Sequence, residues 1–263
     1  MMQRIFAIAL NTFRESTRNL VLLGIALVVA ATMFGAMVLG AFTLHEQART
    51  ARDVGIAGIS LIGSLIAIFL GAVLLYNEVH RRTIQTIISK PIERYEFVLG
   101  KYLGMVATLS VLVVLFVLSL AGLLALQGVP FSAPVVKAVM LGFMQVMVVA
   151  AIALFFSSFS SPFMSSAFSL GVFVLGRWTA EMRDAVNSNF DDWARNLCSV
   201  ALHILPDLNM LTISGGTLRG QHVSVHGDFV TWGYVFSSVA YAALYLTILL
   251  VGAIVVFSQR DFS

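Results

Sequence analysis

The residues YLGMVATLSVLVVLFVLSLAGLLALQGVPFSAPVV, numbers 102–136, carry no charged side chain, and a second charge-free stretch runs from 138 to 176. A helix that crosses a bilayer needs about 20 apolar residues, so each stretch is long enough to span a membrane. Glycine and proline residues between 127 and 134 interrupt the first stretch, because these residue types break helices. The sequence therefore predicts two spans here, at about residues 102–126 and 133–156.

The rest of the chain repeats this pattern. Residues 19–44, 54–77 and 229–259 are also free of charge, and only 11% of the 263 residues are Asp, Glu, Lys or Arg, against about a quarter in a soluble domain. The windows are apolar throughout instead of alternating, which argues against a β-barrel, and the single cysteine excludes a disulfide scaffold. The net charge of +3 comes from residues that flank the windows, so it does not indicate nucleic-acid binding. The composition predicts an all-α polytopic membrane protein.

We predict one transmembrane domain over residues 1–263, with six spans. The predicted spans are residues 20–44, 54–76, 102–126, 133–156, 163–178 and 233–257. The fifth span, 163–178, is close to the lower length limit, and a re-entrant hairpin is the alternative. Gly100 and Gly104, just before and inside the third span, form a GxxxG pattern that is typical of close helix packing in membranes.

Two polar segments are predicted to form amphipathic helices. In residues 1–19, apolar side chains recur every three or four residues, which predicts a helix in the membrane interface that acts as an anchor or a docking element. Residues 179–232, before the last span, show the same spacing from Met182 to Ile204 and predict an extracytoplasmic helical segment. That segment is either a lid over the span ends or a surface that recognises a substrate.

Lys and Arg in short loops predict the orientation, because they accumulate on the cytoplasmic side. With the N-terminus inside, nine such residues lie on the inner side, and three, Arg49, Arg52 and Lys137, lie in short outer loops. Lys137 and Arg177 lie near span ends, where their charges can extend to the interface. Six spans then leave both termini in the cytoplasm.

The predicted spans contain no Asp, Glu or His. Ion-coupled transporters and pumps place such groups at membrane depth, so the chain lacks an energy-transducing site of its own. It also lacks a GxxxxGK[ST] motif, and therefore a P-loop for ATP. A membrane enzyme would need polar residues clustered at one depth, and the nearest group, residues 157–166, has no base and predicts a turn. If the chain moves a substrate, a partner must supply the energy.

The inner loop at residues 77–101 is the strongest candidate for contact with such a partner. Ile84, Ile87 and Ile88 share one face of a short predicted helix, and Pro91 ends it, since the residue before a proline leaves the α region. An apolar stripe between basic flanks fits a groove on another protein. The alternative is an ordinary basic loop on the cytoplasmic side.

The same loop resembles the signature loop of ABC type-2 transporter permeases. The matching residues are Glu78, Arg82-Thr83-Ile84, Ser89-Lys90-Pro91-Ile92-Glu93-Arg94 and Phe97-Val98-Leu99-Gly100-Lys101. They most resemble the subgroup that includes the permease for nitrous-oxide-reductase maturation. The tail at 257–262 is similar to the F-x-R-R-D-F end of that subgroup, and residues 205–208, Leu-Pro-Asp-Leu, to its pattern before the last span. Many relatives carry Gly where this chain has Arg82.

This resemblance implies a homodimer of permeases that carries two cytoplasmic P-loop ATPase subunits. ATP and magnesium would bind to the ATPases, and the permease would bind no cofactor and catalyse no reaction. The complex would be an exporter in the bacterial inner (plasma) membrane, with the loop as its coupling helix. The residues implied at the ATPase contact are Glu78, Arg81, Arg82, Thr83, Ile84, Ile87, Ile88, Lys90, Pro91 and Arg94. The alternative keeps the ATPase but transmits force to an extracytoplasmic partner, as a maturation factor, without bulk transport.

One polar stretch of the outer segment contains possible metal ligands. His222, His226 and Asp228 would face the same way in an extended strand, so that two imidazoles and one carboxylate could meet a metal ion. The alternative, a polar outer hairpin, is favoured because three ligands are few. No metal site is predicted.

Overall fold

The computed structural model describes residues 2–18, 21–42, 47–80, 93–187, 192–212, 217–218, 221–222 and 230–259. The bounds of its helices are α1 Met2–Arg18, α2 Val21–Phe42, α3 Gln47–His80, α5 Arg94–Leu126, α6 Ala133–Ser157, α7 Pro162–Arg177, α8 Thr179–Asn187, α9 Asp192–Ile204, the 3₁₀ helix η1 Leu208–Leu211, and α10 Trp232–Ser258. Two short strands, β1 Thr217–Leu218 and β2 Gln221–His222, pair antiparallel. The predicted helical class is confirmed.

Five of these helices are long and apolar enough to cross a membrane. The five stretches are Leu23–Phe42, Arg49–Leu74, Arg94–Leu126, Ala133–Ser157 and Trp232–Ser258. They lie in five of the six predicted spans, and the chain is therefore a membrane protein.

The predicted fifth span is a helix with almost the predicted bounds, but it is short. α7 has 16 residues, which corresponds to about 24 Å of helix, while the hydrocarbon core of a bilayer is about 30 Å thick. The structure therefore supports five crossings by length, and a sixth crossing remains a prediction.

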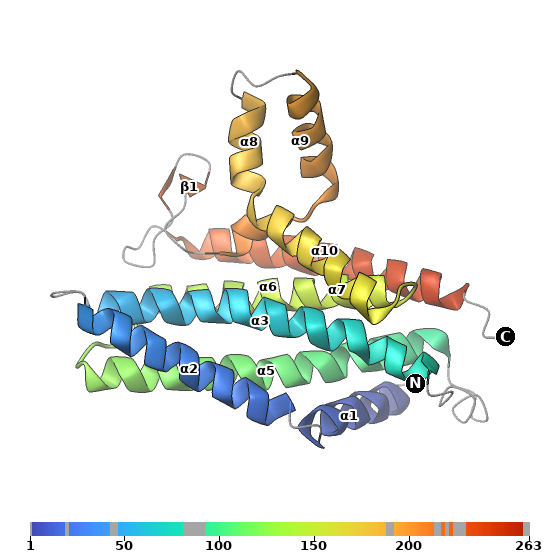
Figure 1. The fold of residues 1–263 in the computed structure, drawn as a ribbon, viewed down its shortest axis with the longest axis horizontal. Helices are drawn as coiled ribbons and strands as arrows, with labels where there is room; N and C mark the ends of the chain where they lie inside the picture. Colours follow the sequence, from blue (N-terminus) through green and yellow to red (C-terminus); the bar gives the residue numbers. More distant parts are fainter. Residues whose placement is uncertain are drawn as a thin grey trace.

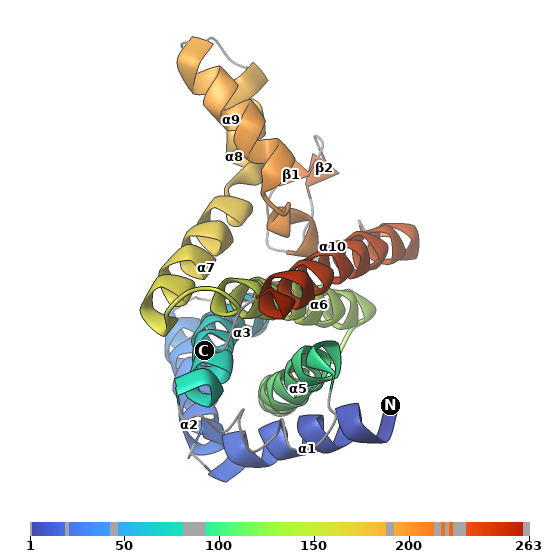
Figure 2. The same cartoon turned by 90° about the vertical axis from the view of Figure 1, so that its right-hand side faces the viewer.

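The helices run back and forth along one axis (Figure 1). The start of α5 and the ends of α3, α6 and α10 lie at the same end of the bundle, and both chain termini lie there too. Seen along the bundle, α6 occupies the middle, with α3, α5, α7 and α10 around it (Figure 2). The N-terminal helix α1 lies across this view beside α5, so it is not parallel to the spans.

α3 and α6 approach each other so closely that side chains would clash at the glycines between them. A Cβ atom on Gly71 would lie 2.7 Å from the Cβ of Ala153, and one on Gly63 would lie 2.9 Å from Val146. Small residues allow such contacts between helix backbones in membranes, where van der Waals packing drives association. The α3–α6 pair forms the centre of the bundle.

A cluster of polar side chains lies buried beside this pair, contrary to the prediction that none gathers at one depth. Gln145 lies at the middle of α6, and its Oε1 accepts hydrogen bonds from Ser60 Oγ at 2.8 Å and Thr212 Oγ1 at 3.0 Å. Arg177, at the end of α7, donates to Ser60 Oγ at 2.7 Å. The members come from α3, α6, α7 and the residue after η1, which is why no local pattern in the sequence indicated the cluster.

Candidate coupling site

The loop with the predicted ATPase contacts lies between the end of α3 and the start of α5. Glu78 belongs to the last turn of α3, and Arg94 is the first residue of α5. The other predicted contact residues lie outside the described part of the chain, and they are Arg81, Arg82, Thr83, Ile84, Ile87, Ile88, Lys90 and Pro91. What the structure describes is how the two helices that flank the loop are held.

The predicted loop is longer than the connection that the structure has. Residues 94–101, predicted as loop, are the first two turns of α5, and Glu93 is the N-cap of that helix. The N–H group of Glu93 donates to the Glu96 carboxylate at 3.4 Å, the arrangement of a capping box. The start of α5 is therefore fixed directly after the loop.

Arg94 connects this start to the end of α10. Its guanidinium donates to the carbonyl oxygens of Ser258 at 2.6 Å and Phe257 at 3.3 Å. A cation at the C-terminus of a helix satisfies free carbonyls and interacts favourably with the helix dipole. The Phe97 and Phe257 rings also stack, with centroids 5.9 Å apart. The loop pattern and the tail pattern, which are far apart in the sequence, thus meet in space.

The GxxxG pattern of α5 packs against α1, as close helix packing would predict. A Cβ atom on Gly100 would lie 2.7 Å from the Cβ of Ile8, and one on Gly104 would lie 2.5 Å from that of Thr12 and 2.7 Å from the carbonyl oxygen of Ala9. Neither glycine leaves room for a larger side chain unless α1 moves. The predicted apolar stripe of α1 is therefore divided, because Ile8 and Ala9 face α5 while Met2 and Phe6 stay exposed.

Two ion pairs join the same helices. Lys101 Nζ lies 3.8 Å from Glu15 Oε2, and Arg4 NH1 lies 3.9 Å from Glu96 Oε2. The Lys101 side chain is only 2% exposed, so its charge needs a partner, and Glu15 on α1 provides one. Packing and charge together hold α1 to the segment that leaves the loop.

No local pattern in the sequence indicates these pairs, because their members lie far apart in the chain. Arg4 is one of the nine inner-side cations of the prediction, and Lys101 is both one of them and part of the loop that resembles the permeases. A lysine one residue after the first glycine of a GxxxG pattern is the nearest thing to a signal, since a cation on a packing face must have a partner.

A protein-family model described as "ABC-2 family transporter protein" matches residues 6–262. The chain belongs to the ABC-2 transporter family. No curated protein matches the chain. The match runs from within α1 to beyond α10 and includes the loop between α3 and α5. It makes the chain a membrane permease component of an ABC transporter, a class that works with an ABC ATPase subunit.

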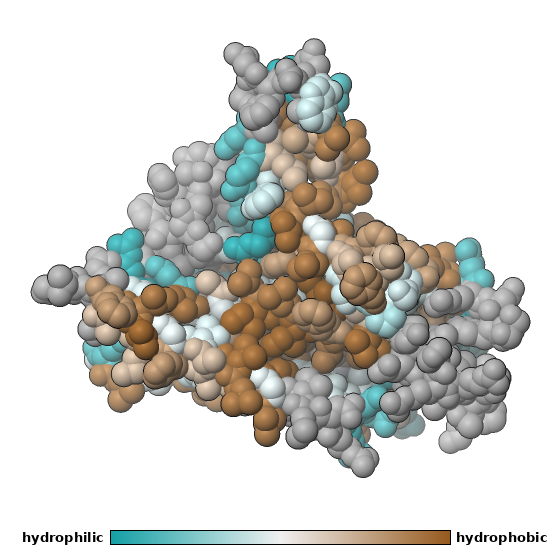
Figure 3. Space-filling model, in the orientation of Figure 1, coloured by the Kyte–Doolittle hydropathy of each residue, from teal (hydrophilic) through white to brown (hydrophobic). Residues whose placement is uncertain are grey.

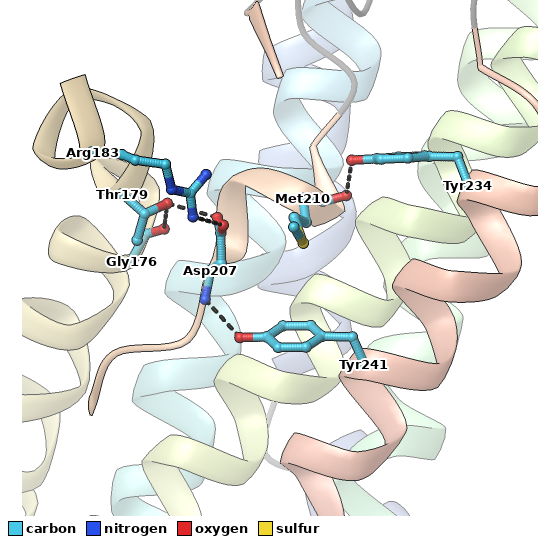
Figure 4. Close-up of polar contacts among 7 residues, drawn as sticks. All are labelled: Gly176, Thr179, Arg183, Asp207, Met210, Tyr234 and Tyr241. Atoms are coloured by element: carbon cyan, nitrogen blue, oxygen red, sulfur yellow. Dashed lines mark hydrogen bonds and ion pairs between the residues drawn. The ribbon is translucent and has the colours of Figure 1, made fainter. Parts of the chain in front are cut away.

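At the base of the α8–α9 hairpin, this ABC-2 permease has a second connected group around Asp207 (Figure 4). The Asp207 carboxylate accepts from Thr179 Oγ1 at 2.6 Å and from Arg183 at 2.9 Å. Its N–H group donates to the Tyr241 hydroxyl at 2.9 Å. Tyr234, also on α10, donates to the carbonyl oxygen of Met210 at 2.8 Å. Asp207 thus joins α8 and α10, which gives the Leu-Pro-Asp-Leu pattern of residues 205–208 a structural role.

The two cations predicted to extend to the interface turn inward instead. Lys137 is 6% exposed, donates to the carbonyl oxygen of Val230 at 2.7 Å, and lies 5.2 Å from the centre of the Trp232 ring. Arg177 points to Ser60. Each finds polar or aromatic partners inside the protein, which compensates for the loss of water.

The metal hypothesis stays open. His222 ends β2, while His226 and Asp228 lie outside the described residues. Within the described ranges, no group of three or more His, Cys, Asp or Glu side chains could hold a metal ion.

Proposed function

We propose that this ABC-2 permease is the membrane subunit of an ATP-driven exporter. A separate cytoplasmic ATPase binds the loop between α3 and α5, and its closure on ATP moves that loop. The observation that carries the proposal is the anchoring of α5 directly after the loop. Arg94 ties it to α10, and Gly100 and Gly104 tie it to α1, so a push on the loop displaces three helices together.

The assembly proposed is a homodimer with two ATPase subunits, which hold the ATP and magnesium, in a bacterial inner (plasma) membrane. Membership of the nitrous-oxide-reductase maturation subgroup is part of the proposal and rests on the resemblance of the loop and the tail. The same resemblance is the basis for the contact residues between Glu78 and Arg94.

Six crossings and cytoplasmic termini complete the proposed topology. α7 runs back toward the outer end of the bundle, and both termini lie at the end where α5 begins (Figure 1). The α8–α9 hairpin projects sideways, with α8 on its hydrophilic side and α9 on its hydrophobic side (Figure 3). The hydrophobic side is turned toward the end that holds the termini, which suits a hairpin resting on the outer leaflet.

Copurification tests the proposal directly. The tagged permease, extracted from its native membrane, should bring a P-loop ATPase with it in a one-to-one ratio. Reversing the charges of Arg81, Arg82 and Lys90 should release the ATPase and abolish ATP-dependent activity. A purified complex without an ATPase, or full activity in the triple variant, would refute the proposal.

A second function, force transmission to an extracytoplasmic partner without transport, is favoured by one observation. α9 exposes four large apolar side chains on one face, and they are Trp193, Leu197, Val200 and Ile204. A face of this kind can bind a protein as well as a lipid surface. The variant Trp193→Ser/Leu197→Ser separates the two functions, because loss of a partner with unchanged substrate flux supports force transmission.

A further inference from the structure

Arg177 is a half-buried cation that forms no ion pair with a described residue. Arg183 pairs with Asp207, and Lys101 pairs with Glu15. Lys137 has no carboxylate partner either, but the Val230 carbonyl oxygen and the Trp232 ring interact with its charge. Arg177 donates to the neutral hydroxyl of Ser60, and Glu181, the described carboxylate that acts on it electrostatically, forms no ion pair with it. A half-buried guanidinium without an ion-pair partner is costly at membrane depth, and such groups commonly mark a functional site.

The hydrogen bonds around Arg177 leave most of its donors available. Ser60 accepts from Arg177 and donates in turn to Gln145, whose oxygen also accepts from Thr212. The hydroxyl hydrogen of Ser60 is therefore donated to Gln145, and the Ser60 oxygen is the one described group that accepts from Arg177. A guanidinium has five N–H donors, arranged to bind planar oxyanions with two hydrogen bonds.

The position of Arg177 decides what can reach it. It ends α7 at the root of the outer hairpin, next to Trp178, which is 59% exposed. Val174 and Leu175, just before it on α7, are also exposed. Gln145 and Ser60 are buried, so the network comes to the surface at Arg177, among apolar side chains that an acyl chain can cover.

We propose that Arg177 binds an oxyanion, a phosphate ester or a carboxylate, at the outer end of α7. The oxyanion supplies a counter-charge in direct contact with the guanidinium, which Glu181 does not. The apolar surface of α7 suits an amphiphile whose acidic headgroup lies at Arg177. Binding itself does not depend on the ATPase, while a role of this ligand as the exported substrate rests on the proposed function.

The test uses the full-length permease in phosphatidylcholine nanodiscs, without an ATPase. Phosphatidylglycerol is titrated in one arm and inorganic phosphate in the other, with bound ligand counted by native mass spectrometry and the shift in unfolding temperature recorded. Wild type should bind phosphatidylglycerol, and Arg177→Gln should bind it about tenfold more weakly, the equivalent of about 1.4 kcal/mol. Arg49→Gln, which removes an exposed outer cation, should bind like wild type.

Two further variants keep the proposal testable if Arg177→Gln does not fold. Arg177→Lys keeps the charge and should keep part of the affinity, and Ser60→Ala keeps the guanidinium and should retain the ligand-dependent shift in unfolding temperature. Binding in both arms would show that a free oxyanion suffices, and binding of phosphatidylglycerol alone would assign the site to an amphiphile. Wild type that binds neither probe, or Arg177→Gln that binds as wild type does, would overturn the proposal without affecting ATPase coupling.

Discussion

At the scale of single residues, charges in this bundle hold helices together. Asp207 accepts hydrogen bonds from two side chains of α8 and donates its backbone N–H to α10. Its side chain is only 13% exposed. Its loss would leave Thr179 with the more distant carbonyl oxygen of Gly176 as acceptor, and the half-exposed Arg183 with water. The carboxylate therefore holds α8, while the backbone N–H of the same residue holds α10.

Replacing Asp207 with Ala should therefore destabilise the attachment of α8. Hydrogen bonds to a charged group contribute about 1.5–3 kcal/mol, and the lower part of that range applies because Arg183 is 44% exposed. The expected fall in unfolding temperature is about 4 °C, from the usual relation between free energy and melting temperature. Asp184→Asn, which changes an exposed acid on α8 next to Arg183, serves as the control. An equal fall in unfolding temperature in both variants would contradict the role of Asp207.

Arg94 gives a second prediction at this scale, which concerns coupling. Arg94→Gln removes the charge-assisted hydrogen bonds to the end of α10, so α10 should no longer follow α5. We expect ATP hydrolysis by the complex to continue while transport per ATP falls about tenfold, as the loss of about 1.4 kcal/mol of linkage would give. Arg94→Lys retains the charge, so its transport per ATP should fall less than that of Arg94→Gln. The ratio of transport to hydrolysis in proteoliposomes measures this, and an unchanged ratio would separate Arg94 from coupling.

At the scale of helices, the sequence predicted the spans well, but it placed both ends of α3 and the start of α5 several residues too far inside the helices. The charge-free windows locate α2, α3, α5, α6 and α10, because a bilayer demands length and apolarity from each helix separately. Residues 94–101 were assigned to a loop because they contain Glu96 and Lys101. Both are buried in the structure, and each pairs with a residue of α1. Local hydropathy counts a charge against a span even when a distant helix compensates that charge. The Ser60–Gln145–Arg177 cluster was not predicted because its members also come from different helices.

The contact between α1 and α5 can be tested with two glycines of one helix. Gly104→Ala places a methyl group against Thr12 and the backbone of Ala9, whereas Gly122→Ala meets no atom within 4 Å. Overpacking costs about 1–3 kcal/mol, so Gly104→Ala should unfold at a lower temperature and lose ATP-dependent transport. Gly122→Ala should be as stable as wild type or slightly more, because Ala favours helices. Similar behaviour of the two variants would argue against a tight α1–α5 contact.

At the scale of the whole molecule, the short helix α7 decides the topology. If α7 crosses the membrane, Ser160 lies inside with Gln259, and the α8–α9 hairpin lies outside. If α7 enters and leaves on one side, the hairpin shares a side with Ser160. The turn before α7 and the exposed Asp184 on α8 therefore lie on opposite sides of the membrane in the first arrangement and on the same side in the second. The length of α7, about 24 Å, does not distinguish these arrangements. The direction of α10 favours the first, because α10 ends at the same end of the bundle as α6.

Single cysteines at these positions, in a Cys198→Ser background, make the distinction in intact cells. Ser160→Cys and Gln259→Cys should react with a membrane-impermeant maleimide only after the cells are opened, and Asp184→Cys should react before. The expectation follows from the excess of Lys and Arg that the sequence predicts on the inner side, where both termini are predicted to lie. Outer labelling of Gln259→Cys with inner labelling of Ser160→Cys would reduce the count to five crossings. The hairpin and Arg177 would then face the cytoplasm, and the binding site proposed for an outer-leaflet amphiphile would have to serve the inner leaflet instead.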